Sequence, residues 1–126
     1  MAIKLLDLSA RAEHVSAIDD NKEKTKFIVG PLTARQLFAI YGRFEDDSES
    51  STGMALMAME MVKYGLRDVK GDLGKGFSLK TGNKLGFKCD VVDQSYIDTL
   101  PVSIITEVAQ WVGEMSRVGE VPKDNS

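Results

Sequence analysis

Cysteine and histidine, the residue types that most often combine in nucleophilic catalysis, occur once each, as Cys89 and His14. A cysteine–histidine enzyme needs both side chains adjacent in space and a third group that orients the base. Cys89 instead lies in an alternating run that is typical of a strand burying a small thiol. One cysteine and one histidine also cannot form a structural zinc site. We therefore predict no catalytic residue, no metal site and no enzymatic activity.

Two short segments resemble ligand-binding loops without matching them. The glycine-rich segment 71–76 lacks the G-x-x-x-x-G-K-[ST] spacing of a phosphate-binding loop, and a strand is expected after it, not a helix. The acidic residues Asp46, Asp47 and Glu49 lack the spacing and the central glycine of an EF-hand. We interpret the first segment as the approach to a hairpin and the second as a solvated loop, and we expect no cofactor.

Lysines gather in one part of a chain whose net charge is -3. The aromatic residues among them, Phe77 and Phe87, alternate inward and offer no stacking platform for bases. The lysines are therefore interpreted as the solvated face of a hairpin, and no nucleic-acid binding is expected. They are Lys70, Lys75, Lys80, Lys84 and Lys88.

The composition is that of one compact domain. The 126 residues are 43% hydrophobic and 28% charged, which is enough apolar material for a core without staples. We expect a single domain over residues 1–118 and a flexible tail over 119–126. No apolar run approaches the length of a membrane span, and a lone cysteine fits a reducing compartment, so we expect no membrane partner and a cytoplasmic location.

Three helices are predicted. Thr33 and Gln36 have the T-x-x-Q form of a capping box, after which apolar residues recur at helical spacing through Phe44. A second helix is expected from Thr52 to Tyr64, closing at Gly65. The third follows Pro101 and carries a clear apolar face. The predicted core lies between them and consists of Leu37, Ile40, Met57, Met61, Ile104, Val108, Trp111 and Val112.

Two hairpins complete the predicted fold. Residues 14–29 read as strand, polar turn and strand, and residues 77–91 read as a second hairpin that turns at 81–83. A short extra turn is expected at Tyr96 and Ile97. The fold class is therefore α+β, predominantly α, with three main helices and one or two small antiparallel hairpins.

The second helix is too apolar for a single core-facing stripe. Its methionines either fill the core or form a surface that accepts other proteins, because methionine is flexible and polarizable. An apolar circumference this complete requires another helix, a second subunit or a client protein to cover part of it. The predicted partner-binding residues are Tyr41, Phe44, Met54, Leu56 and Met59.

The order of these elements resembles a known family. Residues 31–36 read PLTARQ at a helix start, residues 65–71 read GLRDVKG after the middle helix, and Leu100-Pro101 opens the last helix. Together they resemble the tail assembly chaperones of long-tailed, siphovirus-like bacteriophages and prophages, over about residues 25–118.

This resemblance implies a protein that assembles others. Such chaperones bind the tape measure protein, keep that long helical chain soluble, and help tail tube subunits polymerise around it in the host cytoplasm. They are absent from the finished virion, and a ribosomal frameshift often makes an extended second product. The family has no catalytic residues to carry over. Self-association is a further expectation.

Other functions stay open at this point. One is a phage structural or connector protein that remains in the virion, and another is a small cytoplasmic protein-interaction domain without phage ties. An enzyme using Cys89 and His14 and a nucleic-acid regulator are the less favoured alternatives, for the reasons given above.

Overall fold

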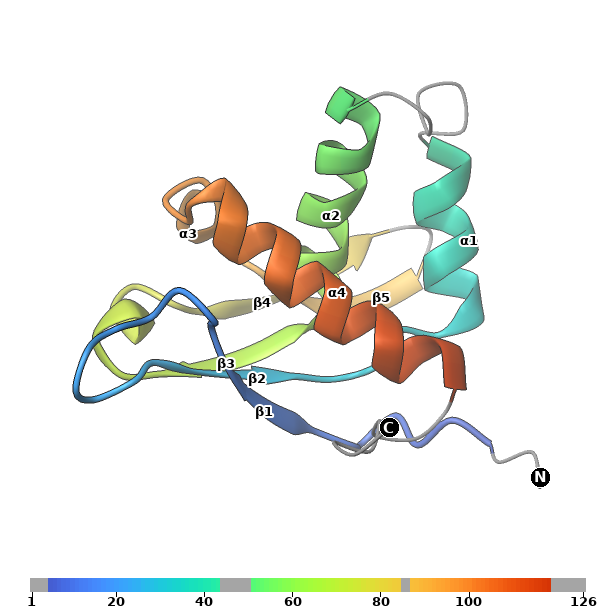
Figure 1. The fold of residues 1–126 in the computed structure, drawn as a ribbon. Coiled ribbons are helices and arrows are strands. Elements are labelled where there is room, and N and C mark those ends of the chain that lie inside the picture. Colours follow the sequence, from blue (N-terminus) through green and yellow to red (C-terminus); the bar gives the residue numbers. More distant parts are fainter. Residues whose placement is uncertain (1–4, 44–50, 85–86, 119–126) are drawn as a thin grey trace.

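Helices pack on one side of two small sheets in this chain (Figure 1). The computed structural model describes residues 5–43, 51–84 and 87–118. Within these ranges there are four α-helices and two antiparallel sheets, of three and two strands. The α+β prediction is confirmed, but strands form a larger part of the fold than "predominantly α" expresses.

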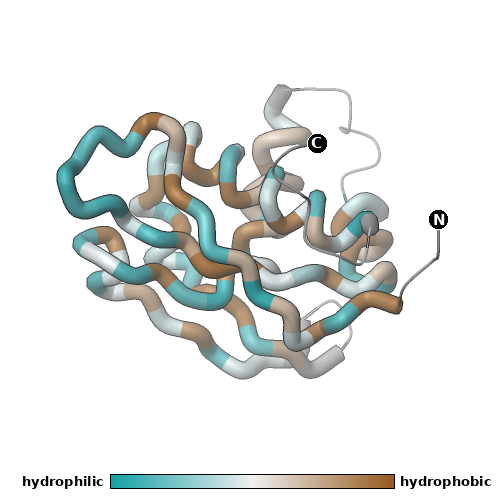
Figure 2. Tube along the Cα trace, turned by 60° about the horizontal axis from the view of Figure 1, so that its bottom comes forward, coloured by the Kyte–Doolittle hydropathy of each residue, from teal (hydrophilic) through white to brown (hydrophobic). Residues whose placement is uncertain are grey.

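The larger sheet has the order β1-β2-β3. Its strands are β1 (Ala12–Val15), β2 (Lys26–Val29) and β3 (Leu66–Lys70). The first two form the predicted N-terminal hairpin, joined by the polar connection that is the long teal stretch in Figure 2. Strand β3 was not predicted, because it follows helix α2 (Ser51–Gly65) without an intervening turn.

The smaller sheet is a hairpin of β4 (Leu79–Lys84) and β5 (Phe87–Val92). It confirms the second predicted hairpin but not its turn. Residues 81–83 lie inside β4, where Gly82 pairs with Cys89, so the chain reverses later than predicted. The turn-forming types Thr-Gly-Asn are tolerated here because β4 is an edge strand, which places weaker demands on its residues than a central strand does.

The helices begin where their capping chemistry predicts. Helix α1 (Ala34–Arg43) follows a complete capping box, in which the Thr33 N–H donates to Gln36 Oε1 at 3.0 Å and the Gln36 N–H donates to Thr33 Oγ1 at 3.1 Å. The short turn predicted near Tyr96 is α3 (Gln94–Ile97). Helix α4 (Val102–Val118) starts directly after Pro101, whose carbonyl accepts the first helical bonds.

Helices α2 and α4 approach each other at two glycines. A Cβ on Gly65 would lie 2.4 Å from a methyl carbon of Val112, and one on Gly113 would lie 3.2 Å from the end of Met61. Gly65 was predicted as the helix terminator. The structure gives another reason for a glycine at this position. The helix continues directly into β3, and a residue without a side chain is needed there because α4 lies against it.

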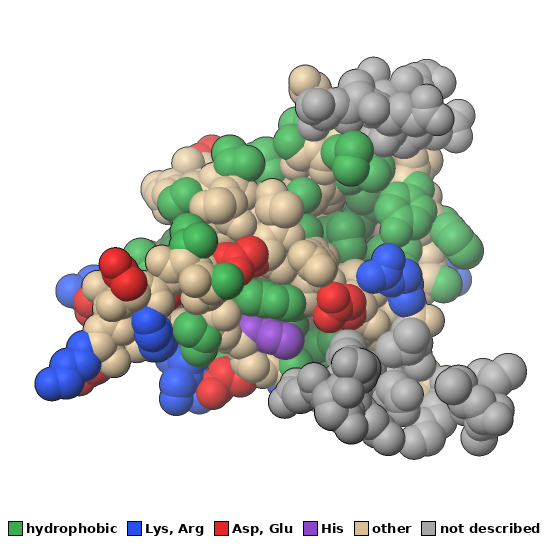
Figure 3. Space-filling model, in the orientation of Figure 1, with side chains coloured by type: hydrophobic (Ala, Val, Ile, Leu, Met, Phe, Trp, Pro, Cys, Tyr) green, Lys and Arg blue, Asp and Glu red, His purple; other side chains and the backbone are tan. Residues whose placement is uncertain are grey.

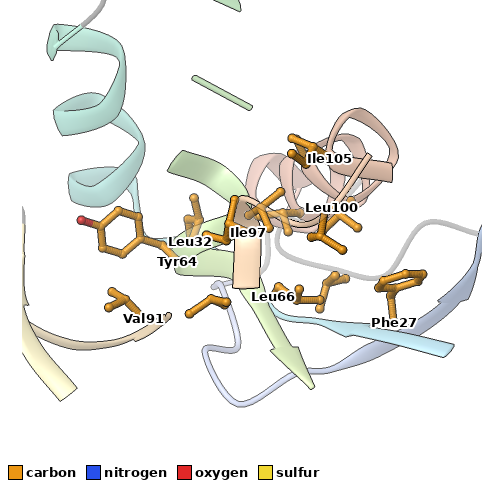
Figure 4. Packing of buried hydrophobic residues seen from close by; sticks show 14 of the residues in the cluster. Phe27, Leu32, Tyr64, Leu66, Val91, Ile97, Leu100 and Ile105 are labelled. Carbon is orange, nitrogen blue, oxygen red and sulfur yellow. The ribbon is translucent and has the colours of Figure 1, made fainter. Parts of the chain in front are cut away.

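The core lies between the helices and the sheets, and Figure 4 shows side chains from both layers meeting there. Five of the eight predicted core residues are buried, while Met57, Met61 and Trp111 pack against the core and stay partly exposed. The prediction placed the core among the helices alone. Its centre also includes residues of the strands, of the connection between β2 and α1, and of α3: Phe27, Val29, Leu32, Leu66, Val92 and Ile97.

Candidate partner-binding surface

Helices α1 and α2 present a group of exposed apolar side chains, which we call the α1–α2 surface. Figure 3 shows hydrophobic side chains gathered where these two helices lie. Single exposed apolar residues are common, whereas several that gather on neighbouring helices are less usual on a surface. The residues and their exposed fractions are Phe38 71%, Met54 57%, Tyr41 42% and Leu56 41%.

The surface exists because α2 is longer than the core beneath it. The second half of the helix is anchored by Val62 and Tyr64, which are both buried. The first half, residues 52–56, is exposed apart from Gly53, and the methionine and leucine there have no core to enter. The surplus apolar character that the sequence predicted is thus located at the N-terminal end of α2.

A buried carboxylate ties α1 to α2 next to this surface. Glu60 of α2 is 8% exposed, and it forms ion pairs with Arg43 of α1 and, at 3.5 Å, with Lys63. Burial, with a smaller effect from the negative charge of Glu60, raises the pKa of Tyr64 to about 12. The Arg43 pair therefore links α1 to α2, whereas the Lys63 pair lies within α2.

The predicted partner-binding residues divide into three groups. Tyr41, Met54 and Leu56 are exposed, so they are accessible to a partner. Met59 is half-buried and packs against the core. Phe44 lies outside the described residues. Phe38 was not predicted, because it lies one position away from the apolar stripe that begins at Leu37. A phenylalanine outside the apolar stripe of a short helix was the signal that the sequence offered.

The two residues considered for nucleophilic catalysis have different surroundings. The His14 ring on β1 stacks on Trp111 of α4, with centroids 4.6 Å apart and planes inclined by 8°. Cys89 lies on β5 in the other sheet, partly buried against the core. The structure therefore assigns each of them a packing environment.

The remaining sequence candidates also have plain structural surroundings. Residues 72–74 form a single 3-10 turn, and Lys80 pairs with Asp93 at 3.4 Å. The acidic residues 46, 47 and 49 lie outside the described residues. Among the residues that are described, no group of three or more His, Cys, Asp or Glu side chains is placed to hold a metal ion. Nor does any helix in that part of the chain have the length and apolarity to cross a membrane.

Comparison with known proteins adds no relative. The chain matches no family model, no curated protein and no solved structure.

Proposed function

We propose that this protein is a tail assembly chaperone of a long-tailed bacteriophage or prophage. In this role it binds the tape measure protein and tail tube subunits in the host cytoplasm during tail morphogenesis, without catalysis. The observation that carries the proposal is the α1–α2 surface, which presents apolar side chains on helices that are themselves anchored in the core. The motif order described from the sequence supplies the particular class of client.

The chemistry of this surface suits reversible binding. Burying one large apolar side chain contributes about 1.5–3 kcal/mol, and part of that is offset by the entropy lost on association. Four such side chains contribute at most about 6–12 kcal/mol, which is similar in size to the cost of association, so we expect a reversible contact. An assembly factor that must leave its client needs contacts of this strength.

The side chains also suit a client with a varied sequence. Methionine and leucine adapt to differently shaped apolar partners, whereas Phe38 and Tyr41 provide larger flat contacts. The ion pair between Glu60 and Arg43 links α1 to α2 and helps to keep these groups together before the client arrives. The surface is then preorganised, which lowers the entropic cost of binding.

The DNA that follows the coding sequence tests the assignment. We expect a slippery heptanucleotide near codon 126, an overlapping second frame, and then a long reading frame coding for a mainly helical protein. Metabolic or housekeeping genes in that position would contradict the proposal.

Purified phage particles separate the chaperone from a virion protein. Mass spectrometry of such particles should detect tail tube and tape measure peptides but none from this chain. Its presence at a stoichiometry comparable to other tail proteins would identify it as a structural or connector protein.

A further inference from the structure

We draw no further inference here: the strongest candidate, the exposed apolar face that α1 and α2 present with Phe38, Tyr41, Met54 and Leu56, belongs to the surface already described, and nothing in the described part of the chain shows what else, such as a second copy, covers it.

Discussion

At the scale of single residues, the fold depends on how closely α2 and α4 can approach. Gly65 lies where the two helices are nearest, and its neighbour Val112 is fully buried. Interiors are packed as densely as organic crystals, so an added methyl group there has no free volume to enter. Among the described residues, Gly65 is not one of the glycines with a positive φ. Glycine is therefore needed at this position for lack of space and not for its backbone conformation.

The substitution Gly65→Ala should destabilise the protein by about 1–3 kcal/mol, the usual cost of overpacking a core. Urea unfolding followed by circular dichroism would measure it. Gly42→Ala in α1 is the matched control. A Cβ there meets nothing within 4 Å, so this change should be neutral or slightly stabilising. Equal effects of the two substitutions would contradict the close helix contact.

Two buried tyrosines should make the protein less stable at alkaline pH. Burial raises the pKa of Tyr96 to about 12, as it does for Tyr64, and the Tyr96 hydroxyl donates to the Leu73 carbonyl at 2.6 Å. Between pH 10 and 12 the unfolded chain releases these protons while the folded chain keeps them. The unfolded state then binds fewer protons, so stability falls as the pH rises through this window.

The variant Tyr64→Phe tests that linkage, because phenylalanine cannot ionise. Between pH 9 and pH 11 it should lose less unfolding free energy than the wild type, as measured by urea unfolding at each pH. Below pH 9 the difference between the two proteins should not change with pH. Parallel losses up to pH 11 would show that Tyr64 ionises in the folded protein as readily as in the unfolded one.

At the scale of elements, the N-terminal hairpin packs against α4 through two sets of contacts. His14 stacks on Trp111, and beyond the end of β1 the Ser16 hydroxyl and the Ala17 N–H, the latter at 2.9 Å, both donate to the Glu107 carboxylate. Trp111 also contacts Phe27 of β2, with ring centroids 6.1 Å apart. The hairpin is thereby held against the helix by stacking and by a charge-assisted pair of hydrogen bonds.

The fluorescence of Trp111 reports this attachment, since the chain has one tryptophan and one histidine. The stack places the imidazole ring against one face of the indole and so sets the surroundings of the indole. We expect the emission spectrum of His14→Gln to differ from that of the wild type, because the ring that covers the indole is lost. Identical spectra of the two folded proteins would contradict the stacked geometry.

The helices and hairpins could be predicted because their signals are local. The Thr33–Gln36 capping box and the polar connection between β1 and β2 lie within a few residues of the structure they determine. Strand β3 could not be predicted, because its pairing with β2 joins residues about 40 positions apart and depends on the sheet already formed. The same reason explains why the core was placed among the helices without Phe27 or Leu66.

The candidate surface was predictable only in part. The excess apolar character of α2 indicated that part of the helix must face another helix, a second subunit or a client protein, and Met54 and Leu56 are exposed in the structure. Periodicity alone could not show that the exposed part is the first half of the helix and that Met59 packs inward. That division depends on where α4 and the sheets end, which no local pattern specifies.

At the scale of the whole molecule, the sheets, α4, the second half of α2 and the buried side of α1 share one core. The outer sides of α1 and of the first half of α2 carry Phe38, Tyr41, Met54 and Leu56, and other exposed apolar side chains, such as Ile18 and Val102, lie apart from them. The Glu60–Arg43 ion pair links α1 to α2 beside the α1–α2 surface. Because the side chains of that surface are exposed, substitutions there should change binding without changing folding.

Co-purification with the tape measure protein from the same genome tests the central claim most directly. The wild type should keep that protein soluble on co-expression and elute with it. The double variant Phe38→Glu, Met54→Glu should lose this ability while unfolding within about 0.5 kcal/mol of the wild type, as expected for exposed positions. Val102→Glu, which changes an equally exposed apolar residue on α4, should behave as the wild type. A double variant that folds and still solubilises the tape measure protein would contradict the assignment of client binding to the α1–α2 surface.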